Sequence, residues 1–273
     1  MRAASRQSYA TARERLDALA AGTPPDRLRT IADELLAVAG LLADQPRLRR
    51  ALTDPSRSGE DRAGLLRGLV AGRVGDQTGE VLDVLVAGRW STGTELLTGC
   101  EELGVQALLA SAEQDGSLAE VEDELFRFAQ VVAGDPGLAA AIGDRSVPTV
   151  RRAALVADLL AGRATQITVR AATIALGGLG GRTVAGGLTR LVEAAAERRE
   201  RSVAYVTVAT PLTGEDERRL GAALAARYGR GISLKTTVDP RVIGGVRVQV
   251  GADLYDGTVA SRLAQARTAL ASG

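Results

Sequence analysis

The sequence predicts an α+β protein that is mainly α-helical, with two tandem helical bundles followed by a small β-α-β-β-α domain. Three observations lead to this prediction. Apolar residues recur at helical spacing over most of the first 200 residues, this helical pattern occurs twice at an offset of 90 residues, and valine-rich strand patterns begin only after Arg201. We therefore expect three domains, at residues 1–110, 111–200 and 201–273.

The helical part contains an internal repeat. Residues 32–73 align without a gap with residues 122–163, and 17 of the 42 aligned positions are identical. The alignment preserves the apolar face, the prolines Pro46 and Pro136, and a closing Ala-Gly-Arg triplet in each copy. Because the alignment register, the residues that end helices and the apolar face are all preserved, we expect the chain to encode the same helical bundle twice.

Each copy begins with a long amphipathic helix. Apolar residues at alternating spacings of three and four define its buried face in the first copy, and equivalent residues follow 90 positions later: Leu28, Ile31, Leu35, Val38, Leu42, then Leu118, Val121, Leu125, Phe128, Val132. A proline ends each helix, and a short helix, a polar loop and a further helix that stops at a glycine follow. Apolar segments indicate more helices as far as residue 200.

After residue 201 the pattern changes to alternating strands and helices. Residues 203–209 are β-branched and uncharged, as expected of a strand covered on both faces. A helix is predicted over residues 213–228, a strand over 232–238, and a valine ladder over 246–250 that pairs behind the connection from the preceding strand. A last helix is predicted over 259–270. This order gives the β-α-β-β-α domain.

Composition excludes several kinds of chemistry. The chain has no histidine, so histidine-based catalysis and zinc binding are excluded. Its only lysine, Lys235, is not preceded by the glycines of a phosphate-binding loop. The glycine cluster Gly177–Gly181 lacks dinucleotide-binding spacing and is interpreted as a turn between helices. We expect no catalytic residue, no cofactor and no metal.

The single cysteine, Cys100, cannot form an internal disulfide, which favours a reducing compartment. The amino terminus lacks the apolar core of a signal peptide, and no window approaches the roughly 20 apolar residues of a membrane span. We therefore expect a cytosolic chain whose association with a membrane comes only through a partner.

Two other functional classes remain open from the residues alone. A helical nucleic-acid-binding or other adaptor protein could use the arginines Arg47, Arg49 and Arg50, or Arg151 and Arg152, as a phosphate patch. The formal net charge of +1 and the 3% aromatic content argue against this class, and binding to random nucleic acid that weakens with salt would support it.

An enzyme that uses only carboxylates is the second open class. The acidic pairs Asp33/Glu34 and Glu101/Glu102 are its candidates. Adjacent residues of a helix diverge instead of facing one another, so we interpret these carboxylates as solvated faces or caps. Turnover by the isolated chain would support this alternative.

The most informative segment lies near the carboxyl terminus. It combines a D-P pair, a G-G pair, alternating valines, a further glycine and a D-G-T triplet: Asp239, Pro240, Gly244, Gly245, Val246, Val248, Val250, Gly251, Asp256, Gly257 and Thr258. The glycines supply turn dihedrals, and the valines line one face of a strand. This order resembles the carboxyl-terminal signature of the delta subunit of rotary F-type ATP synthases, called the oligomycin sensitivity conferral protein in mitochondria.

The resemblance implies a mechanical role. In that family a helical bundle holds the amino-terminal helices of the alpha subunits of the catalytic head, and the carboxyl-terminal domain, which bears the signature, holds the end of the membrane-anchored b subunit. The chain would then be a single-copy, non-catalytic stator subunit of an ATP-synthesising, proton-transporting complex. It would lie at the cytoplasmic face of the cell membrane, attached through b, with no nucleic acid partner. An ordinary member of this family has one bundle, whereas this sequence has two.

The second copy of the bundle adjoins the signature domain, as in single-bundle relatives. We therefore expect it to hold the alpha helices, and the first copy to be an added element of the stalk. Phe126 lies two positions before the core residue Phe128 and points off the core face. In the alignment of the two copies, its equivalent in the first copy is Leu36. An off-face aromatic residue is a candidate partner contact, although a wider core stripe explains it almost as well.

Overall fold

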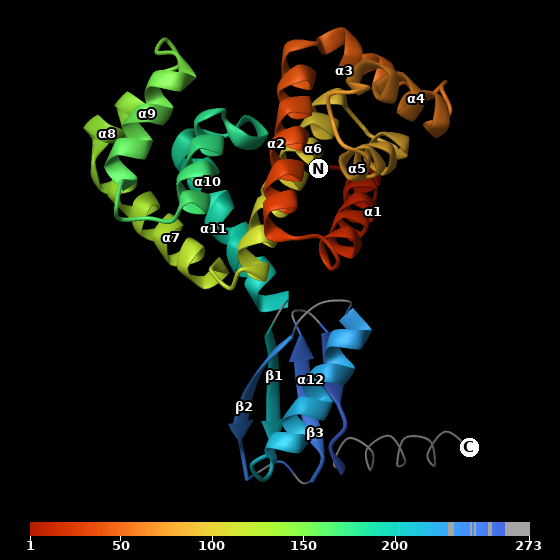
Figure 1. Ribbon diagram of the computed structural model, residues 1–273, viewed down its shortest axis with the longest axis vertical. Helices are drawn as coiled ribbons and strands as arrows, with labels where there is room; N and C mark the ends of the chain where they lie inside the picture. The colour runs from red at the N-terminus through yellow and green to blue at the C-terminus, as the bar shows by residue number, and fades with distance from the viewer. Residues whose placement is uncertain (202, 229–231, 241, 243, 251–252, 260–273) are drawn as a thin grey trace. The chain divides into compact units, whose positions relative to one another are not determined.

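The structure, a computed structural model, describes the chain except for residues 202, 229–231, 241, 243, 251–252 and 260–273 (Figure 1). The chain forms two compact units, Met1–Ala195 and Ala196–Gly273. The described residues contain twelve α-helices and four strands, with every strand in the second unit. The predicted fold class, α+β and mainly α, is confirmed.

The helices of the first unit recur at an interval of 90 residues. The first set comprises α1 (Ala3–Ala20), α2 (Pro25–Asp44), α3 (Pro46–Leu52), α4 (Gly59–Val70), α5 (Asp76–Ala87) and α6 (Gly93–Gln114). The second set comprises α7 (Leu118–Gly134), α8 (Pro136–Gly143), α9 (Thr149–Leu160), α10 (Gln166–Leu176), the 3-10 turn η1 (Leu179–Gly181) and α11 (Val184–Arg201). Thus α2 to α6 correspond to α7 to α11, and α1 corresponds to the first 18 residues of α6.

Equivalent residues end and begin equivalent helices. Pro46 and Pro136 occupy the first turns of α3 and α8, as expected from their fixed backbone and missing N–H. The glycines that follow α4 and α9, Gly72 and Gly162, have φ of 71° and 67°. Both glycines therefore adopt the left-handed conformation expected at a carboxyl-terminal helix end.

A buried hydrogen-bond motif is also repeated. The carboxylate of Glu124 on α7 accepts hydrogen bonds from the backbone N–H of Thr165, at 2.9 Å, and from the hydroxyl of Thr168, at 2.6 Å. Ninety residues earlier, Glu34 on α2 accepts from the backbone N–H of Gly75 and the hydroxyl of Thr78. Each glutamate thereby ties its long helix to the start of another helix of the same copy.

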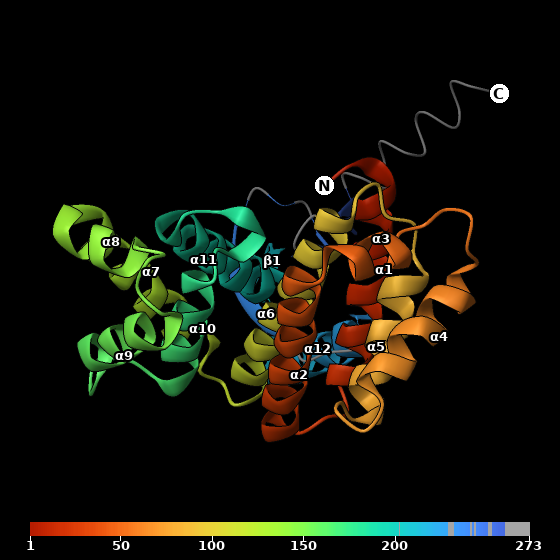
Figure 2. The ribbon, with the colours of Figure 1, turned by 90° about the horizontal axis from the view of Figure 1, so that it is seen from above.

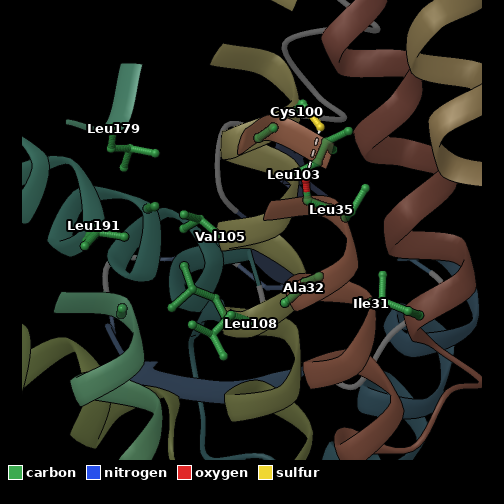
Figure 3. Close-up of a cluster of buried hydrophobic side chains, with 14 of the residues drawn as sticks. Ile31, Ala32, Leu35, Cys100, Leu103, Val105, Leu108, Leu179 and Leu191 are labelled. Atoms are coloured by element: carbon green, nitrogen blue, oxygen red, sulfur yellow. Dashed lines mark hydrogen bonds between the residues drawn. The ribbon is translucent and has the colours of Figure 1, made fainter. Parts of the chain in front are cut away.

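The helix α6 belongs to both copies. In Figures 1 and 2, α1 to α5 lie on one side of α6, and α7 to α10 lie on the other. Every residue of α6 from Leu103 to Ala112 is buried, which is the burial expected of a helix covered all round. In Figure 3, Leu35 of α2 lies on one side of α6 and Leu191 of α11 on the other, and the Cys100 thiol donates to the Leu35 carbonyl oxygen at 3.3 Å.

Polar contacts also join the two copies. Arg170 on α10 forms an ion pair with Asp33 on α2, and Arg190 on α11 lies 3.5 Å from the carboxylate of Glu102 on α6. The predicted domain boundary at residue 110 lies inside α6. The division of the first 200 residues into two domains stays a prediction.

The second unit is a four-stranded mixed sheet with one helix among its described residues. Its elements are β1 (Val203–Val208), α12 (Gly214–Tyr228), β2 (Ser233–Val238), β3 (Val246–Val250) and β4 (Asp253–Asp256). The strand order is β2-β1-β3-β4, with β1 parallel to β2 and antiparallel to β3. Ala204, Val206 and Val208 of β1 are buried with Leu224 of α12, which places the core on the face covered by this helix.

Three details of this unit differ from the fold predicted from the sequence. The valine ladder β3 does not pair with the preceding strand β2, because β1 lies between them. Strand β1 is paired along both edges but is not covered on both faces, since Tyr205 is 46% exposed. The fourth strand, β4, was not predicted, and the last helix, expected over 259–270, lies outside the described residues after Val259.

Candidate partner-binding surfaces

The glycine pair of the carboxyl-terminal signature forms a tight turn into β3. Gly244 and Gly245 have φ of 62° and 82°, a conformation that residues with a Cβ rarely adopt. A Cβ at Gly245 would overlap the carbonyl oxygen of Gly257 and lie 3.0 Å from the Cα of Thr258. The backbone N–H of Gly257 also donates to the carbonyl oxygen of Val246 at 2.9 Å. The two glycine-containing loops of the signature therefore pack directly on each other.

Asp256 orders the end of β4. Its carboxylate accepts hydrogen bonds from the backbone N–H of Thr258 at 3.1 Å and from the Thr258 hydroxyl at 2.6 Å. The guanidinium of Arg247, on β3, donates to the same carboxylate at 3.0 Å. These interactions, led by the hydroxyl hydrogen bond, lower the pKa of Asp256. Asp256 is thus ionised at neutral pH and fixes the chain that follows β4.

The remaining signature residues lie at the end of β2 and after β3. The backbone N–H of Asp239 donates to the carbonyl oxygen of Val208 at 2.9 Å, which joins the end of β2 to that of β1. Pro240 is exposed, and Gly251 lies outside the described residues. The described part of the signature therefore builds the fold of the second unit, and its contact with b stays a prediction.

Phe126 is a half-exposed aromatic residue on α7. Its side chain is 50% exposed, whereas that of Phe128 is 5% exposed, which agrees with the expected directions of the two side chains. The equivalent residue of the first copy, Leu36, packs on α6, where a Cβ on Gly104 would lie 2.7 Å from the Leu36 Cγ. At this position the second copy therefore has an exposed aromatic side chain, whereas the first copy has a leucine packed against α6. The binding role of Phe126 stays a prediction.

Other apolar side chains on the second copy are also exposed. The exposed residues on α7 and α9, apart from Phe126, are Val131, Val150, Leu155 and Leu159. In the first copy the equivalent residues are Leu41 and Leu65, which are partly buried, Glu60, which is charged, and Leu69, which is 48% exposed. The second copy thus exposes more apolar surface than the first, as partner-binding surfaces do.

The acidic pairs considered for catalysis form separate packing contacts. In the first pair, Asp33 binds Arg170 and Glu34 accepts from the start of α5. In the second pair, Glu101 accepts from the backbone N–H of Gly180 at 2.8 Å, and Glu102 lies near Arg190. Neither pair brings two carboxylates together on one site. The diverging geometry expected from adjacent helical positions is confirmed.

The glycine cluster Gly177–Gly181 forms the connection between α10 and α11, as interpreted from the sequence. Its Gly178, Gly180 and Gly181 have positive φ, and the anion at the Gly180 N–H is the carboxylate of Glu101. This concave backbone therefore binds an acidic side chain of the same chain.

Two arginines of the candidate phosphate patches form structural contacts. Arg49 donates to the carbonyl oxygens of Leu42 and Ala43. Arg152 is 5% exposed and donates to the carbonyl oxygens of Ile142 and Leu176. These guanidinium groups bind helix ends.

Within the described residues, no three acidic or cysteine side chains gather into a group that could hold a metal ion. Among the described helices, none is both long and apolar enough to cross a membrane.

One surface feature was not foreseen from the sequence. A groove of about 510 Å³, which we call the α8 groove, lies at the carboxyl-terminal end of α7 and is lined by α7, α8, α9, α10 and the start of α11. Its residues are dispersed over five segments, so no local motif marks it. The available signal was the difference between equivalent residues of the two copies, such as Arg49 and Ala139.

Comparison with known proteins identifies the family. The sequence model of the ATP synthase delta (OSCP) subunit matches residues 105–270, which run from the middle of α6 through the second copy and the second unit. The chain is 58% identical to the ATP synthase subunit delta of Salinispora arenicola over 269 residues, 98% of each chain. It is 45% identical to the ATP synthase subunit delta of Streptomyces avermitilis, again over 98% of each chain.

Repeated helices and exposed apolar side chains are typical of a protein that works by binding other proteins. With the family match and these relatives, the chain belongs to the ATP synthase delta (OSCP) subunit family. It is a structural subunit of the peripheral stalk of an F-type ATP synthase. Residues 1–104, which contain most of the first copy, lie outside the family match, whereas the matches to both relatives cover 98% of the chain.

Proposed function

We propose that this stalk subunit connects two partners through its two units. The second copy of the bundle holds the amino-terminal helices of the alpha subunits, and the unit from residue 196 onward holds the b subunit. The first copy is an added element of the stalk, attached through α6. The chain lies at the cytoplasmic face of the membrane and reaches the membrane only through b.

The observation that carries the alpha assignment is the exposed apolar surface of the second copy. Phe126 on α7 and Val150 on α9 are 50% and 80% exposed, and the first copy has Leu36 and Glu60 at these positions. An amphipathic helix binds by placing its apolar side chains on such a surface. A leucine or valine buried in such a contact contributes roughly 1.5–3 kcal/mol to the binding free energy, before the entropy cost of ordering the partner is subtracted. A few such side chains are therefore sufficient for tight binding.

The assignment of b is supported by two exposed side chains on one face of the sheet in the second unit. Tyr205 of β1 and Leu254 of β4 both lie opposite Gln249 of β3 in the strand register, so they share one face. They are 46% and 59% exposed, whereas Ala204 and Val206 on the other face are buried. An exposed apolar pair on a rigid sheet suits a helical partner.

Two fragments test the assignment of the ends. Residues 201–273 contain every described strand and α12, and this fragment is expected to fold and to capture the soluble part of b. Residues 1–200 are expected to retain binding to an alpha amino-terminal peptide. Circular dichroism verifies that each fragment is folded. A folded carboxyl-terminal fragment that does not bind b would show that the assignment of the b subunit to this unit is wrong.

A further inference from the structure

The α8 groove has an apolar lining. Its apolar residues come from α7, α8, α10 and α11: Val132, Ala139, Ala140, Leu176, Val184 and Ala185. A concave, mostly apolar surface of about 510 Å³ has the size and character of a ligand or side-chain pocket. Phe126 does not line it, so the α8 groove is separate from the candidate contact on the middle of α7.

The first copy fills the same place with its own side chain. Arg49 on α3 lies against α6, where a Cβ on Gly93 would be 2.8 Å from the Cβ of Arg49. Its guanidinium donates to the carbonyl oxygens at the end of α2, including that of Ala43 at 2.8 Å. In the second copy the equivalents of Arg49 and Gly93 are Ala139 and Thr183, both of which line the groove. The groove is open because Ala139 has no side chain that reaches across it.

The second copy also adds positive charge to this place. Arg145 and Arg182 line the groove, where the first copy has the uncharged residues Pro55 and Thr92. Among the described residues, no carboxylate forms an ion pair with Arg145. Arg182 donates to the carbonyl oxygen of Leu179 at 3.3 Å, and its charge also acts on the Glu101 carboxylate, where it opposes the rise in pKa that burial causes. The one acidic residue of the lining, Asp144, accepts from the backbone N–H and hydroxyl of Ser146.

Of the three arginines in the lining, Arg152 is buried and donates to helix-end carbonyl oxygens, which leaves Arg145 and Arg182 beside the apolar floor. This combination fits one kind of occupant. We propose that the α8 groove docks an acidic amphipathic helix of another subunit of the synthase. Its apolar side chains fill the space taken by Arg49 in the first copy, and its carboxylate pairs with Arg145 and Arg182. Charge-assisted hydrogen bonds donated by the two guanidinium groups to the carboxylate then fix the register of the helix. This contact is additional to the proposed contact at Phe126.

Site-directed cross-linking in the assembled synthase tests the proposal. Ala140 is exposed and lines the groove, so Ala140→Cys can carry a benzophenone maleimide. The native thiol does not compete, because burial raises the pKa of Cys100 to about 12. On illumination we expect a cross-link to a segment of another subunit that has apolar residues at helical spacing and an aspartate or glutamate beside them.

Further substitutions in the Ala140→Cys variant test whether the cross-link depends on the α8 groove. Ala139→Arg introduces the side chain of the first copy and should lower the cross-link yield at least about tenfold, as should the charge reversal Arg145→Glu. Arg145 is exposed, so its replacement keeps the test valid where Ala139→Arg fails to fold. Phe126→Ala should leave the yield unchanged, which separates this proposal from the proposed alpha contact.

The matched control places the probe on the first copy, as Arg50→Cys, and should not capture the same segment. Three results would overturn the proposal. They are no intersubunit cross-link from position 140, a yield unchanged by both Ala139→Arg and Arg145→Glu, and capture of a segment without acidic residues.

Discussion

Arg62 and Arg152 lie 90 residues apart, and each is a buried arginine whose guanidinium binds backbone carbonyl oxygens at the ends of neighbouring helices. Arg62 donates to Val86 at 3.2 Å and to Ala87 at 2.9 Å, at the end of α5. Arg152 donates to Leu176 at 3.1 Å, at the end of α10. Each copy of the bundle thus uses a charged side chain to satisfy helix-end carbonyls that have no partner within the helix.

Replacing this buried arginine should destabilise the first unit. Arg152→Leu leaves the carbonyl oxygens of Ile142 and Leu176 without these donors, and the expected loss is about 2–4 kcal/mol. Its exposed neighbour provides the control, since Arg151→Leu should change stability by less than about 0.5 kcal/mol. Urea unfolding followed by the fluorescence of the buried Trp90 measures both. Equal effects of the two substitutions would refute the role given to Arg152.

Gly245→Val should destabilise the second unit by at least about 2 kcal/mol, because the side chain meets the backbone of Gly257 and φ is positive. The control is Gly221→Ala on α12, whose Cβ would meet nothing closer than Leu234 at 4.0 Å and which should be slightly stabilising. Hydrogen exchange on the whole chain should show the loss only in residues 196–273. Unchanged protection there would show that the turn tolerates a side chain.

The buried carboxylate of Glu101 predicts a pH dependence of stability. Burial, together with the charge of Glu102, raises the pKa of Glu101. A carboxyl group with a raised folded-state pKa favours folding below its unfolded pKa of about 4.3, and this contribution is lost as pH rises through the folded-state pKa. Glu101→Gln retains an acceptor for the Gly180 N–H without the charge.

The variant should therefore be more stable than the native chain at pH 7, and the difference should vanish near pH 4. Thermal melting at both pH values is the measurement. A less stable variant at pH 7 would mean that ionised Glu101 gains more from Gly180 and Arg182 than it loses by burial.

The proposed alpha contact predicts different effects for equivalent residues. Phe126→Ala removes a half-exposed ring and should weaken binding of an alpha amino-terminal peptide by about tenfold or more, with little loss of thermal stability. Leu36→Ala should leave that binding intact, although it removes packing against α6. Calorimetric titration of the peptide compares the two. Equal losses of affinity, or a loss only with Leu36→Ala, would place part or all of the site on the first copy.

Helix positions could be predicted from the sequence where an amphipathic helix buries one stripe of side chains, as α2 and α7 do. Leu35 and Leu125 are fully buried as their spacing indicates, and Pro46 and Pro136 mark the helix boundaries. The repeat by itself does not reveal that α6 packs against helices of both copies. Residues 103–112 contain no charged side chain, which is the sequence signal of a helix buried on all sides.

Strand order and surface sites could not be predicted from the sequence, for physical reasons. Alternation in Val246, Val248 and Val250 indicates which side chains face the core, but it does not identify the neighbouring strand. The α8 groove depends on side chains from five segments, whose convergence requires the fold. The signature glycines were recognisable because a turn with positive φ selects glycine whatever the partner.

This chain works as a stator, and ATP-driven proton pumping tests that role most directly. The synthase is reconstituted in vesicles with and without the chain, and ATP hydrolysis and acidification are measured on the same samples. Without the chain, hydrolysis by the catalytic head should continue while pumping falls to background, because the head is no longer held against the torque of rotation. Undiminished pumping without the chain would contradict the stator role.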